Sequence, residues 1–331
     1  MAAALGVSTK AVAVSVSIVA SKDNSIFANN VDNSNGGGAG IFVGTTNMMQ
    51  SDSLRRGLIE FDVANAVPAG ATITAVNLTM YLGQASGASG VQTIDLHRLT
   101  ADWGEGTAGN FTTSISGTGT GSAASAGDAT WNQRFYQQAS WTAPGAFDDF
   151  VEAISGSTDV AATVDTPYTW LSTPTMASDV QSWLDHPATN DGWILINHTE
   201  GVQQTVKAFY SRDATEKNSV EEPLPPEWHP TLGVTYTLAA LPPSGDYNDN
   251  GVVDASDYVF WRDTLGQSVS PAGSGADGNQ NGLIDSGDYD YWRTRFGNSV
   301  SGLGNGGAIP EPGCAAICIV ALPLVLLRKR R

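Results

Sequence analysis

Residues 75–82 read Ala-Val-Asn-Leu-Thr-Met-Tyr-Leu, and apolar and polar side chains alternate along this stretch. Such alternation is typical of a β-strand with one buried face. Only residues 175–186 resemble a helix, which Pro187 would end. Many short strands between turns predict a mainly β domain over residues 14–238, an antiparallel β-sandwich with jelly-roll-like topology. The other clear strand candidates are residues 14–20, 58–63, 192–197 and 231–237.

Composition excludes some classes of function. The 331 residues carry a formal net charge of −17. Nucleic acid is therefore not an expected partner, since neutralising phosphates needs clustered Lys and Arg. The two cysteines, Cys314 and Cys318, lie in the last apolar segment, so no disulfide can hold the body of the protein together. Evidence for export must come from the two ends of the chain instead.

Two stretches rich in Asp, Asn and Gly, residues 246–257 and 277–288, have the pattern of twelve-residue calcium-binding loops. Each has oxygen-bearing side chains at positions 1, 3, 5, 9 and 12, with glycine at position 6 for the sharp bend. We therefore predict two bound Ca²⁺ ions, with the backbone carbonyl of position 7 as a further ligand. The ligand sets are Asp246, Asn248, Asn250, Val252 (carbonyl), Asp254 and Asp257, and then Asp277, Asn279, Asn281, Leu283 (carbonyl), Asp285 and Asp288.

A short helix is expected after each loop, ending at Gly266 and at Gly297. Apolar side chains at helical spacing predict that the two helices pack on each other, and the residues at loop position 8 are expected to pair between the loops. The expected packing faces are Tyr258, Trp261 and Leu265 on one helix and Tyr289, Trp292 and Phe296 on the other, and the position-8 pair is Val253 and Ile284.

Neither loop follows a helix, because prolines and glycines precede both. Two loops with exit helices only resemble a type I dockerin domain, over about residues 244–298. The resemblance implies calcium dependence and a cohesin-like protein partner bound through the exit helices. The helices hold more Tyr and Trp than typical cohesin binders do. A structural stalk and an internal clasp therefore remain alternatives to partner binding.

The C-terminus carries three features of a sorting signal. Pro310, Glu311 and Pro312 are followed by an apolar run at residues 315–327 and a basic cluster at residues 328–331. This arrangement resembles the PEP-CTERM sorting signal, which implies a short transmembrane segment and processing by an exosortase-type enzyme after export. A simple membrane anchor is the alternative. Both place the body of the protein at the cell surface or outside the cell, with at least transient anchoring in the inner membrane.

Residues 1–13 are expected to be a residual or truncated signal region. Residues 11–13, Ala-Val-Ala, can form the end of a cleavage site. Alternatively, translation starts upstream and the apolar part of the signal is missing. We favour the second interpretation, because residues 14–20 already alternate like a strand.

Several segments of residues 14–238 together resemble the DNRLRE family of bacterial surface domains, which is related to carbohydrate-binding modules. The segments, in the family's order, are residues 20–27, 40–44, 55–62, 67–73, 99–106, 129–131, 144–148, 190–193, 209–214 and 229–232. The resemblance implies the sandwich fold and leaves the ligand open.

A polysaccharide is one possible ligand of this domain. Tryptophans on loops can stack on sugar rings, and arginines can hydrogen-bond their hydroxyls or carboxylates. The alternative uses are tryptophans that pin loops to the domain and arginines paired with Glu60 or Asp62. The candidate residues are Trp103, Trp131, Trp141, Arg55 and Arg56.

No catalytic motif appears, and the four histidines are isolated in the sequence. We therefore expect an exported, non-catalytic cell-surface protein that binds carbohydrate through the β-sandwich and is tethered through the calcium-dependent dockerin-like module. A structural protein of the envelope or matrix without glycan affinity is the alternative, and a polysaccharide-degrading enzyme is the weaker one. The expected parts are a residual signal region (1–13), a DNRLRE-like β-sandwich (14–238), a Pro/Gly linker (239–245), a dockerin-like calcium module (246–298), a Gly-rich linker (299–308) and the sorting tail (309–331).

Overall fold

The computed structural model describes residues 13–46, 53–86, 90–109, 113–115, 119–217, 222–238 and 245–298. The chain divides into two compact units, Met1–Ala239 and Ala240–Arg331. In its described residues the first unit is mainly β, whereas the second consists of loops and two short helices.

The first unit contains all of the described strands. They are β1 (Ala13–Val19), β2 (Lys22–Phe27), β3 (Asn33–Ser34), β4 (Gly40–Thr45), β5 (Leu54–Glu60), β6 (Ala71–Ala85), β7 (Gln92–Leu99), β8 (Ser122–Ala123), β9 (Gln133–Phe135), β10 (Ala139–Ser140), β11 (Phe150–Val160), β12 (Thr166–Trp170), β13 (Trp193–Asn197), β14 (Lys207–Tyr210) and β15 (Thr231–Leu238). Its helical segments are α1 (Val63–Ala66), α2 (Pro174–Asp185) and three 3₁₀ turns, Pro144–Ala146, Pro187–Thr189 and Pro226–Trp228.

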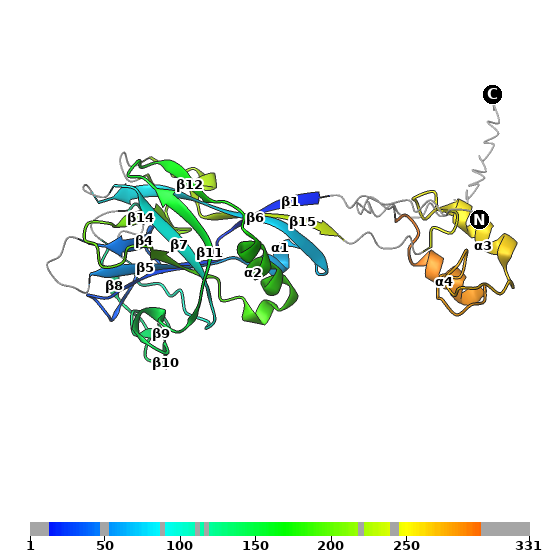
Figure 1. Ribbon diagram of the computed structural model, residues 1–331, viewed down its shortest axis with the longest axis horizontal. Helices are drawn as coiled ribbons and strands as arrows, with labels where there is room; N and C mark the ends of the chain where they lie inside the picture. Colours follow the sequence, from blue (N-terminus) through cyan, green and yellow to red (C-terminus); the bar gives the residue numbers. More distant parts are fainter. Residues whose placement is uncertain are drawn as a thin grey trace, which may run out of the picture. The chain divides into compact units, whose positions relative to one another are not determined.

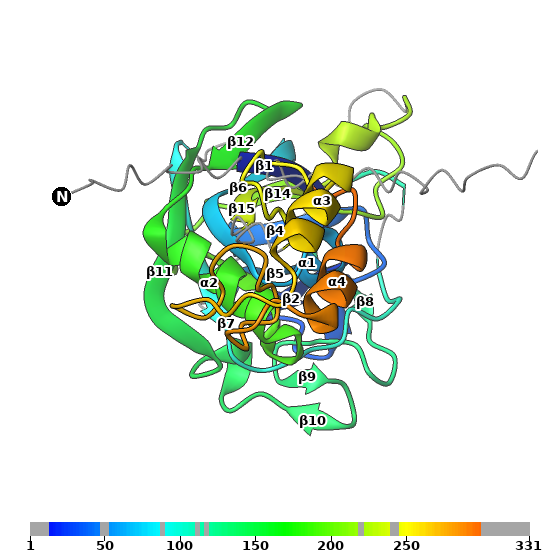
Figure 2. The ribbon, with the colours of Figure 1, turned by 90° about the vertical axis from the view of Figure 1, so that its right-hand side faces the viewer.

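Eleven strands form one antiparallel sheet that curls around a core (Figures 1 and 2). Along the main path the order is β1-β15-β6-β14-β4-β5-β13-β7-β11, while β12 branches from β6 and β2 from β5. Strand β4 joins the two halves, because it pairs with β14 on one side and β5 on the other. The predicted mainly β, antiparallel class is confirmed.

The inner face of this curled sheet carries the main hydrophobic core, which includes Leu78, Leu96, Trp193 and Leu195. A second apolar layer lies on the other face of β13, where Ile194 packs in a cluster with loop residues such as Trp103. Described residues of these loops, Trp103, Ala129, Trp141 and Ala146, thus cover the outer face of β13. They do so because β13 is apolar on both faces, and an uncovered outer face would leave Ile194 and Ile196 in water.

The single long helix of the first unit is close to its predicted position. Helix α2 begins after Thr173, whose hydroxyl accepts a hydrogen bond from the N–H of Met176 at 3.0 Å and so caps the helix. Met176, Val180 and Trp183 are buried in the main core. Figure 1 shows α1 and α2 beside β6.

Five strands of the sheet, β1, β5, β6, β13 and β15, correspond to predicted candidates, and the other six were not among them. Strand β5 starts at Leu54, so Arg55 and Arg56 lie inside a strand rather than before one. Asp62, expected in the same strand, instead caps α1. Strand β11 was not predicted, because its pairing with β7 shifts register between Phe150 and Ile154 and again before Gly156, which disrupts any regular alternation.

The second unit contains helix α3 (Ala255–Thr264) and helix α4 (Ser286–Arg293). Its described residues before each loop form no helix, as the prolines and glycines predict. Gly266 and Gly297 adopt the left-handed conformation, with φ of 85° and 88°, in the turns that follow α3 and α4. Leu265, predicted to pack against the other helix, is instead exposed, because α3 has already ended at Thr264.

Candidate functional site

The first Asp/Asn-rich loop, residues 246–257, folds back on the carboxylate at its start. Asp246 is buried, and its oxygens accept hydrogen bonds from the N–H groups of Asn250 at 3.0 Å and Gly251 at 2.7 Å. The amide oxygens of Asn248 and Asn250 each accept from the N–H two residues ahead, at 3.0 and 2.8 Å. Such turns hold the side-chain oxygens close to the loop backbone.

The second loop, residues 277–288, repeats these hydrogen bonds one for one. Asp277 accepts from Asn281 at 3.1 Å and from Gly282 at 2.8 Å. The amide oxygens of Asn279 and Asn281 again accept from the N–H two residues ahead, at 3.0 and 2.8 Å. Two segments that are distant in sequence therefore adopt the same backbone.

Both loops turn sharply at positions 4 and 6. Asp249 and Gln280, at position 4, have φ of 57° and 61°, and the glycines at position 6 have φ of 89° and 83°. The glycines were expected to allow this bend, since they enter the left-handed region without steric cost. The left-handed residue at position 4 was missed, because neither Asp nor Gln signals that conformation as glycine does.

The last carboxylate of each loop ties the loop to the helix behind it. Asp257 and Asp288 are 0% exposed. Asp257 accepts from the N–H groups of Asn248 and Asp254, at 3.1 and 2.8 Å, and Asp288 accepts from the equivalent groups of the second loop at 3.0 and 2.8 Å. Each carboxylate oxygen has a second lone pair, so these bonds do not exhaust its capacity to act as a ligand.

Three of the loop carboxylates, those of Asp254, Asp257 and Asp277, have shifted pKa values. Hydrogen bonds from the Ser256 hydroxyl and N–H lower the pKa of Asp254. Burial acts to raise the pKa of Asp277, but hydrogen bonds from backbone N–H groups outweigh it and leave that pKa below the ordinary value. Burial raises the pKa of Asp257, and the nearby Asp246 carboxylate adds to the effect. A cation within the loop would favour the ionised form of each group.

The residue types in the loops are those that calcium accepts. Within the described ranges, no group of three or more His, Cys, Asp or Glu side chains is placed to hold a metal ion, and this includes the three aspartates of each loop. Each loop combines these aspartates with two asparagines and a backbone carbonyl. Calcium accepts amide and carbonyl oxygens as readily as carboxylates and needs six to eight oxygens, so a bidentate carboxylate or water can complete this set.

The two repeats share one small core. It is built around Tyr247, Val253, Ala276, Ile284 and Trp292, and partly buried rings of both helices pack against it. Ring centroids of Tyr258 and Trp292 are 5.6 Å apart, and those of Trp261 and Tyr289 are 5.2 Å apart. The predicted packing of the two aromatic faces is therefore confirmed for these residues.

The loops are not paired with each other as predicted. Val253 is bonded through its backbone to Gly297 and Asn298, which follow α4, at 2.8 Å in both cases. Ile284 is bonded to Gly266 at 2.8 Å and Gln267 at 2.9 Å, which follow α3. Each loop is thus tied to the end of the other repeat's helix, and only the side chains of Val253 and Ile284 share the core.

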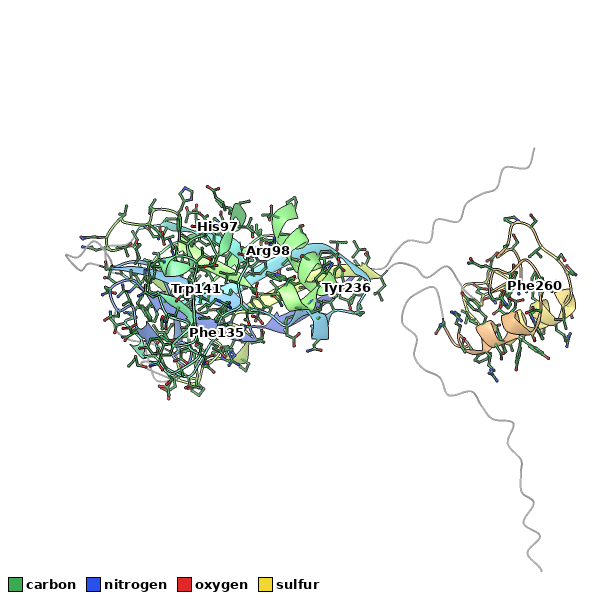
Figure 3. The ribbon with its side chains drawn as sticks, turned by 90° about the horizontal axis from the view of Figure 1, so that it is seen from below. His97, Arg98, Phe135, Trp141, Tyr236 and Phe260 are labelled. Atoms are coloured by element: carbon green, nitrogen blue, oxygen red, sulfur yellow. The ribbon has the colours of Figure 1, made fainter. Side chains whose placement is uncertain are left out.

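Two of the three tryptophans proposed as a sugar platform are buried. Trp103 is 1% exposed and Trp141 is 4% exposed. Their indole N–H groups donate to the backbone oxygens of Asp191 and Thr130, each at 2.9 Å. Trp131 is half-buried and lies beside Arg56. Figure 3 labels Trp141 within the first unit. The structure corrects the choice of Trp103 and Trp141 as exposed residues and supports their alternative use in pinning loops.

The two candidate arginines are also buried. Arg55 donates to backbone oxygens of Gly119 and Ser53, at 3.0 and 2.6 Å, and burial lowers its pKa to about 10. Arg56 forms an ion pair with Glu200 at 2.6 Å. The sequence analysis gave an ion pair with Glu60 or Asp62 as the alternative use of these arginines, and neither arginine forms one. Glu60 instead pairs with Lys22 at 2.6 Å. Both arginines thus hold the first unit together.

A cleft of about 330 Å³ in the first unit was missed by the sequence analysis. It is lined by Gly37, Gly106, Thr107, Arg212 and Asp213. The Arg212 guanidinium is held at its wall by two hydrogen bonds to Glu105, at 2.6 and 2.7 Å. No sequence signal joins these residues, because they come from segments far apart in the chain.

One cluster contains the residue types of a hydrolase triad, but its three side chains are not arranged as in such a triad. Asp95 accepts a hydrogen bond from the Ser157 hydroxyl at 2.5 Å and lies 2.7 Å from Nδ1 of His198. The carboxylate therefore lies between the other two groups. A serine nucleophile needs the imidazole beside its hydroxyl, so this cluster cannot activate Ser157.

Both ends of the chain lie outside the described residues. These include the expected signal region, the sorting motif Pro310, Glu311 and Pro312, and the apolar run at 315–327. Among the helices that the structure does describe, none is sufficiently long and apolar to traverse a membrane.

Comparison with known proteins adds no family. No protein-family model matches this chain, and a search of curated proteins found none similar to it.

Proposed function

We propose that this chain is an exported, non-catalytic surface protein that binds two calcium ions through residues 246–298. One observation carries the proposal. The loops at residues 246–257 and 277–288 have the same set of hydrogen bonds from backbone N–H groups to side-chain oxygens at positions 1, 3, 5 and 12. Ordinary turns have no reason to repeat such a set around oxygen ligands of the number that calcium requires.

Bound calcium would neutralise the aspartates of each loop and fix the loop against its exit helix. The chain's own contribution is the placement of the donors. Asp246 and Asp277 are held by the N–H groups of positions 5 and 6. Asp257 and Asp288 join the start of each helix to the loop, so ordering of the loop is transmitted directly to α3 and α4.

Isothermal titration of the full chain with Ca²⁺ tests the proposal. We expect two ions per chain, and the double variant Asp246→Ala, Asp277→Ala should lose both. The matched control is Asp263→Ala, Asp290→Ala, which also removes one carboxylate from each repeat but at exposed positions on the helices. Absence of calcium binding by the unmodified chain would refute the proposal, and so would equal losses in the two double variants.

The module's role is proposed to be that of a dockerin-like tether. Its aromatic rings pack in the core between α3 and α4, whereas Val259 and Phe260 on α3 are exposed (Figure 3 labels Phe260). These exposed side chains are available to a cohesin-like partner, while the shared core supports the alternative of an internal clasp. Capture of a cohesin by the unmodified chain, lost in a Phe260→Ala variant, would favour the tether.

For the first unit we propose a sandwich of the carbohydrate-binding kind, with the cleft beside Arg212 as its candidate site. The cleft offers a guanidinium, a carboxylate and a hydroxyl, from Arg212, Asp213 and Thr107, which are groups that hydrogen-bond sugars. A structural role without glycan affinity is the alternative, and the burial of Trp103 and Trp141 favours it. Degradation of a polysaccharide is the weaker alternative.

A glycan array separates these alternatives. If the cleft binds sugar, the full chain should bind specific glycans, and Thr107→Ala with Asp213→Ala should abolish binding. Thr72→Ala, an exposed change on β6, is the control. No binding to any glycan would favour the structural role, and release of reducing ends would indicate an enzyme.

Export and sorting complete the proposal. The resemblance of residues 309–331 to a PEP-CTERM signal supports processing by an exosortase-type enzyme and localisation at the cell surface or outside the cell. Mass spectrometry of the C-terminus of the protein from its native host tests this, since processing would remove the apolar run at residues 315–327 and a simple anchor would retain it.

A further inference from the structure

The helices of the second unit reach across to the loops of the opposite repeat. The indole N–H of Trp261, on the helix of the first repeat, donates to the backbone oxygen of Asp285 in the second loop at 2.8 Å. The indole N–H of Trp292, on the helix of the second repeat, donates to the backbone oxygen of Asp254 in the first loop at 3.1 Å. The two hydrogen bonds are reciprocal.

The two residues whose carbonyl oxygens accept these bonds each have two further roles. Asp254 and Asp285 are both at loop position 9, and both are the N-caps of the exit helices, where their side chains accept from Ser256 and Gly287 at 2.7 Å. An indole bound to the carbonyl oxygen therefore orients a residue that is a candidate ligand and a helix cap at once.

Backbone hydrogen bonds also join each loop to the opposite repeat. The position-8 residue of each loop pairs with the turn after the other repeat's helix, through Val253 with Asn298 and Ile284 with Gln267. Neither loop is completed by residues of its own repeat alone.

We infer that Trp261 and Trp292 are positioning residues for the calcium sites of the opposite repeats, and that they couple the two sites. The inference rests on the proposed binding of calcium to both loops. An ion in the second loop fixes Asp285 and with it the helix that carries Trp261. That helix begins in the first loop, which then has less conformational entropy to lose when it binds its own ion. Binding is therefore positively cooperative, and the coupling is the same in both directions.

The crossed arrangement makes a distinctive prediction. In an Asp246→Ala background only the second loop retains its ligands, and Trp261→Phe should weaken its calcium affinity by about 2- to 10-fold, the effect of one net hydrogen bond. Trp292→Phe should have a smaller effect there, although Trp292 lies on the second loop's own helix. In an Asp277→Ala background the order should reverse.

Titration calorimetry of the four full-chain variants measures these affinities, and circular dichroism at saturating calcium verifies that each is folded. If each loop responds more to the tryptophan of its own repeat, or equally to both, the inference is wrong. If the unmodified chain binds no calcium, the proposed function itself fails, so the two failures are distinguishable.

If the tryptophan variants do not fold, a measurement on a chain that retains both tryptophans can still test the inference. In the ¹⁵N-tryptophan-labelled Asp246→Ala chain, calcium should slow hydrogen exchange at the Trp261 indole more than at the Trp292 indole. Protection of Trp292 first, or no change at Trp261, would overturn the inference.

Discussion

Asp23 shows what a single buried carboxyl does in this protein. It is 0% exposed, and Oδ2 accepts a hydrogen bond from the N–H of Arg212 at 2.7 Å. Burial raises its pKa well above the ordinary value, and the nearby carboxylates of Glu105 and Asp213 add to the rise. Between the ordinary and the raised pKa the folded state binds a proton that the unfolded state has lost, so the free energy of unfolding falls as pH rises through this window.

Asp23→Asn should remove this pH dependence. The amide oxygen can still accept from Arg212, but no charge is buried at any pH. We expect the melting temperature of the first unit to fall less between pH 4 and pH 7 in the variant than in the unmodified chain, as measured by differential scanning calorimetry. Glu152→Gln, an exposed change on β11, is the control and should leave the pH dependence unaltered. Parallel curves for Asp23→Asn and the unmodified chain would contradict the interpretation.

Substitution of Trp103 tests how much the loops that cover the outer face of the sheet contribute to stability. Trp103→Ala should reduce the free energy of unfolding of the first unit by about 3–5 kcal/mol, because it leaves a cavity against Ile26, Leu58 and Ile194. Denaturant unfolding of the first unit measures the loss. Trp131→Ala, at a half-buried ring, should cost clearly less. A Trp103→Ala variant as stable as the unmodified chain would restore that tryptophan as a candidate ligand-binding residue.

At the scale of elements, both candidate calcium loops turn at a left-handed glycine at position 6. Gly282 has φ of 83°, and a Cβ there would lie 3.7 Å from the backbone oxygen of Val269, an ordinary van der Waals contact, so Gly282→Ala would add backbone strain without a clash. That strain is roughly 1–2 kcal/mol, which corresponds to an affinity about 5- to 30-fold weaker at the second loop. Calorimetric titration with calcium measures it.

The matched control for that change is Gly70→Ala. Gly70 has φ of 79° and open space around a built Cβ, but it lies before β6 in the first unit. It should lower the stability of that unit and leave calcium affinity unchanged. Equal calcium affinities in the Gly282→Ala variant and the control would show that the second loop binds no ion through this bend.

Strands were predictable where apolar and polar residues alternate and were missed where bulges break that alternation. Strand β13 was predicted, but the loops that cover its outer face were not. Residues 75–82 alternate, and they lie in β6. Strand β11 does not alternate regularly, because its bulges shift the register. In β13 the adjacent apolar residues Ile194 and Leu195 lie in different clusters. Such adjacent pairs are the sequence signal of a strand buried on both faces, and they could have predicted that loops cover this sheet.

The bend of the two candidate calcium loops was predictable because the residues that form each loop are local in sequence. All of the predicted ligands of a loop fall within twelve positions, and glycine marks the bend. The pairing of each loop with the opposite repeat was not predictable, because Val253 and Asn298 are joined by contacts that no local pattern encodes. The cleft at Arg212 was missed for the same reason.

At the scale of the whole molecule, the two units have separate cores among the described residues. The clusters of the first unit contain no residue beyond 238, and the cluster of the second contains none before 247. The second core is built from only a few buried apolar side chains. So small a unit rarely folds stably without a metal or a disulfide, and the body of this chain has no cysteine.

Calorimetric unfolding of the full chain should therefore show two transitions, of which calcium shifts one. At a free calcium concentration 100 times the dissociation constant, each site adds about 2.7 kcal/mol to the stability of the state that binds it. We expect chelation to lower or abolish the transition of the second unit and to leave that of the first unit in place. The Asp246→Ala, Asp277→Ala variant should behave as the chelated chain does, and Asp263→Ala, Asp290→Ala as the calcium-loaded one. A single transition that moves as a whole with calcium would mean that the ions stabilise both units together, whereas two transitions indifferent to calcium would leave the loops as turns held by their own hydrogen bonds.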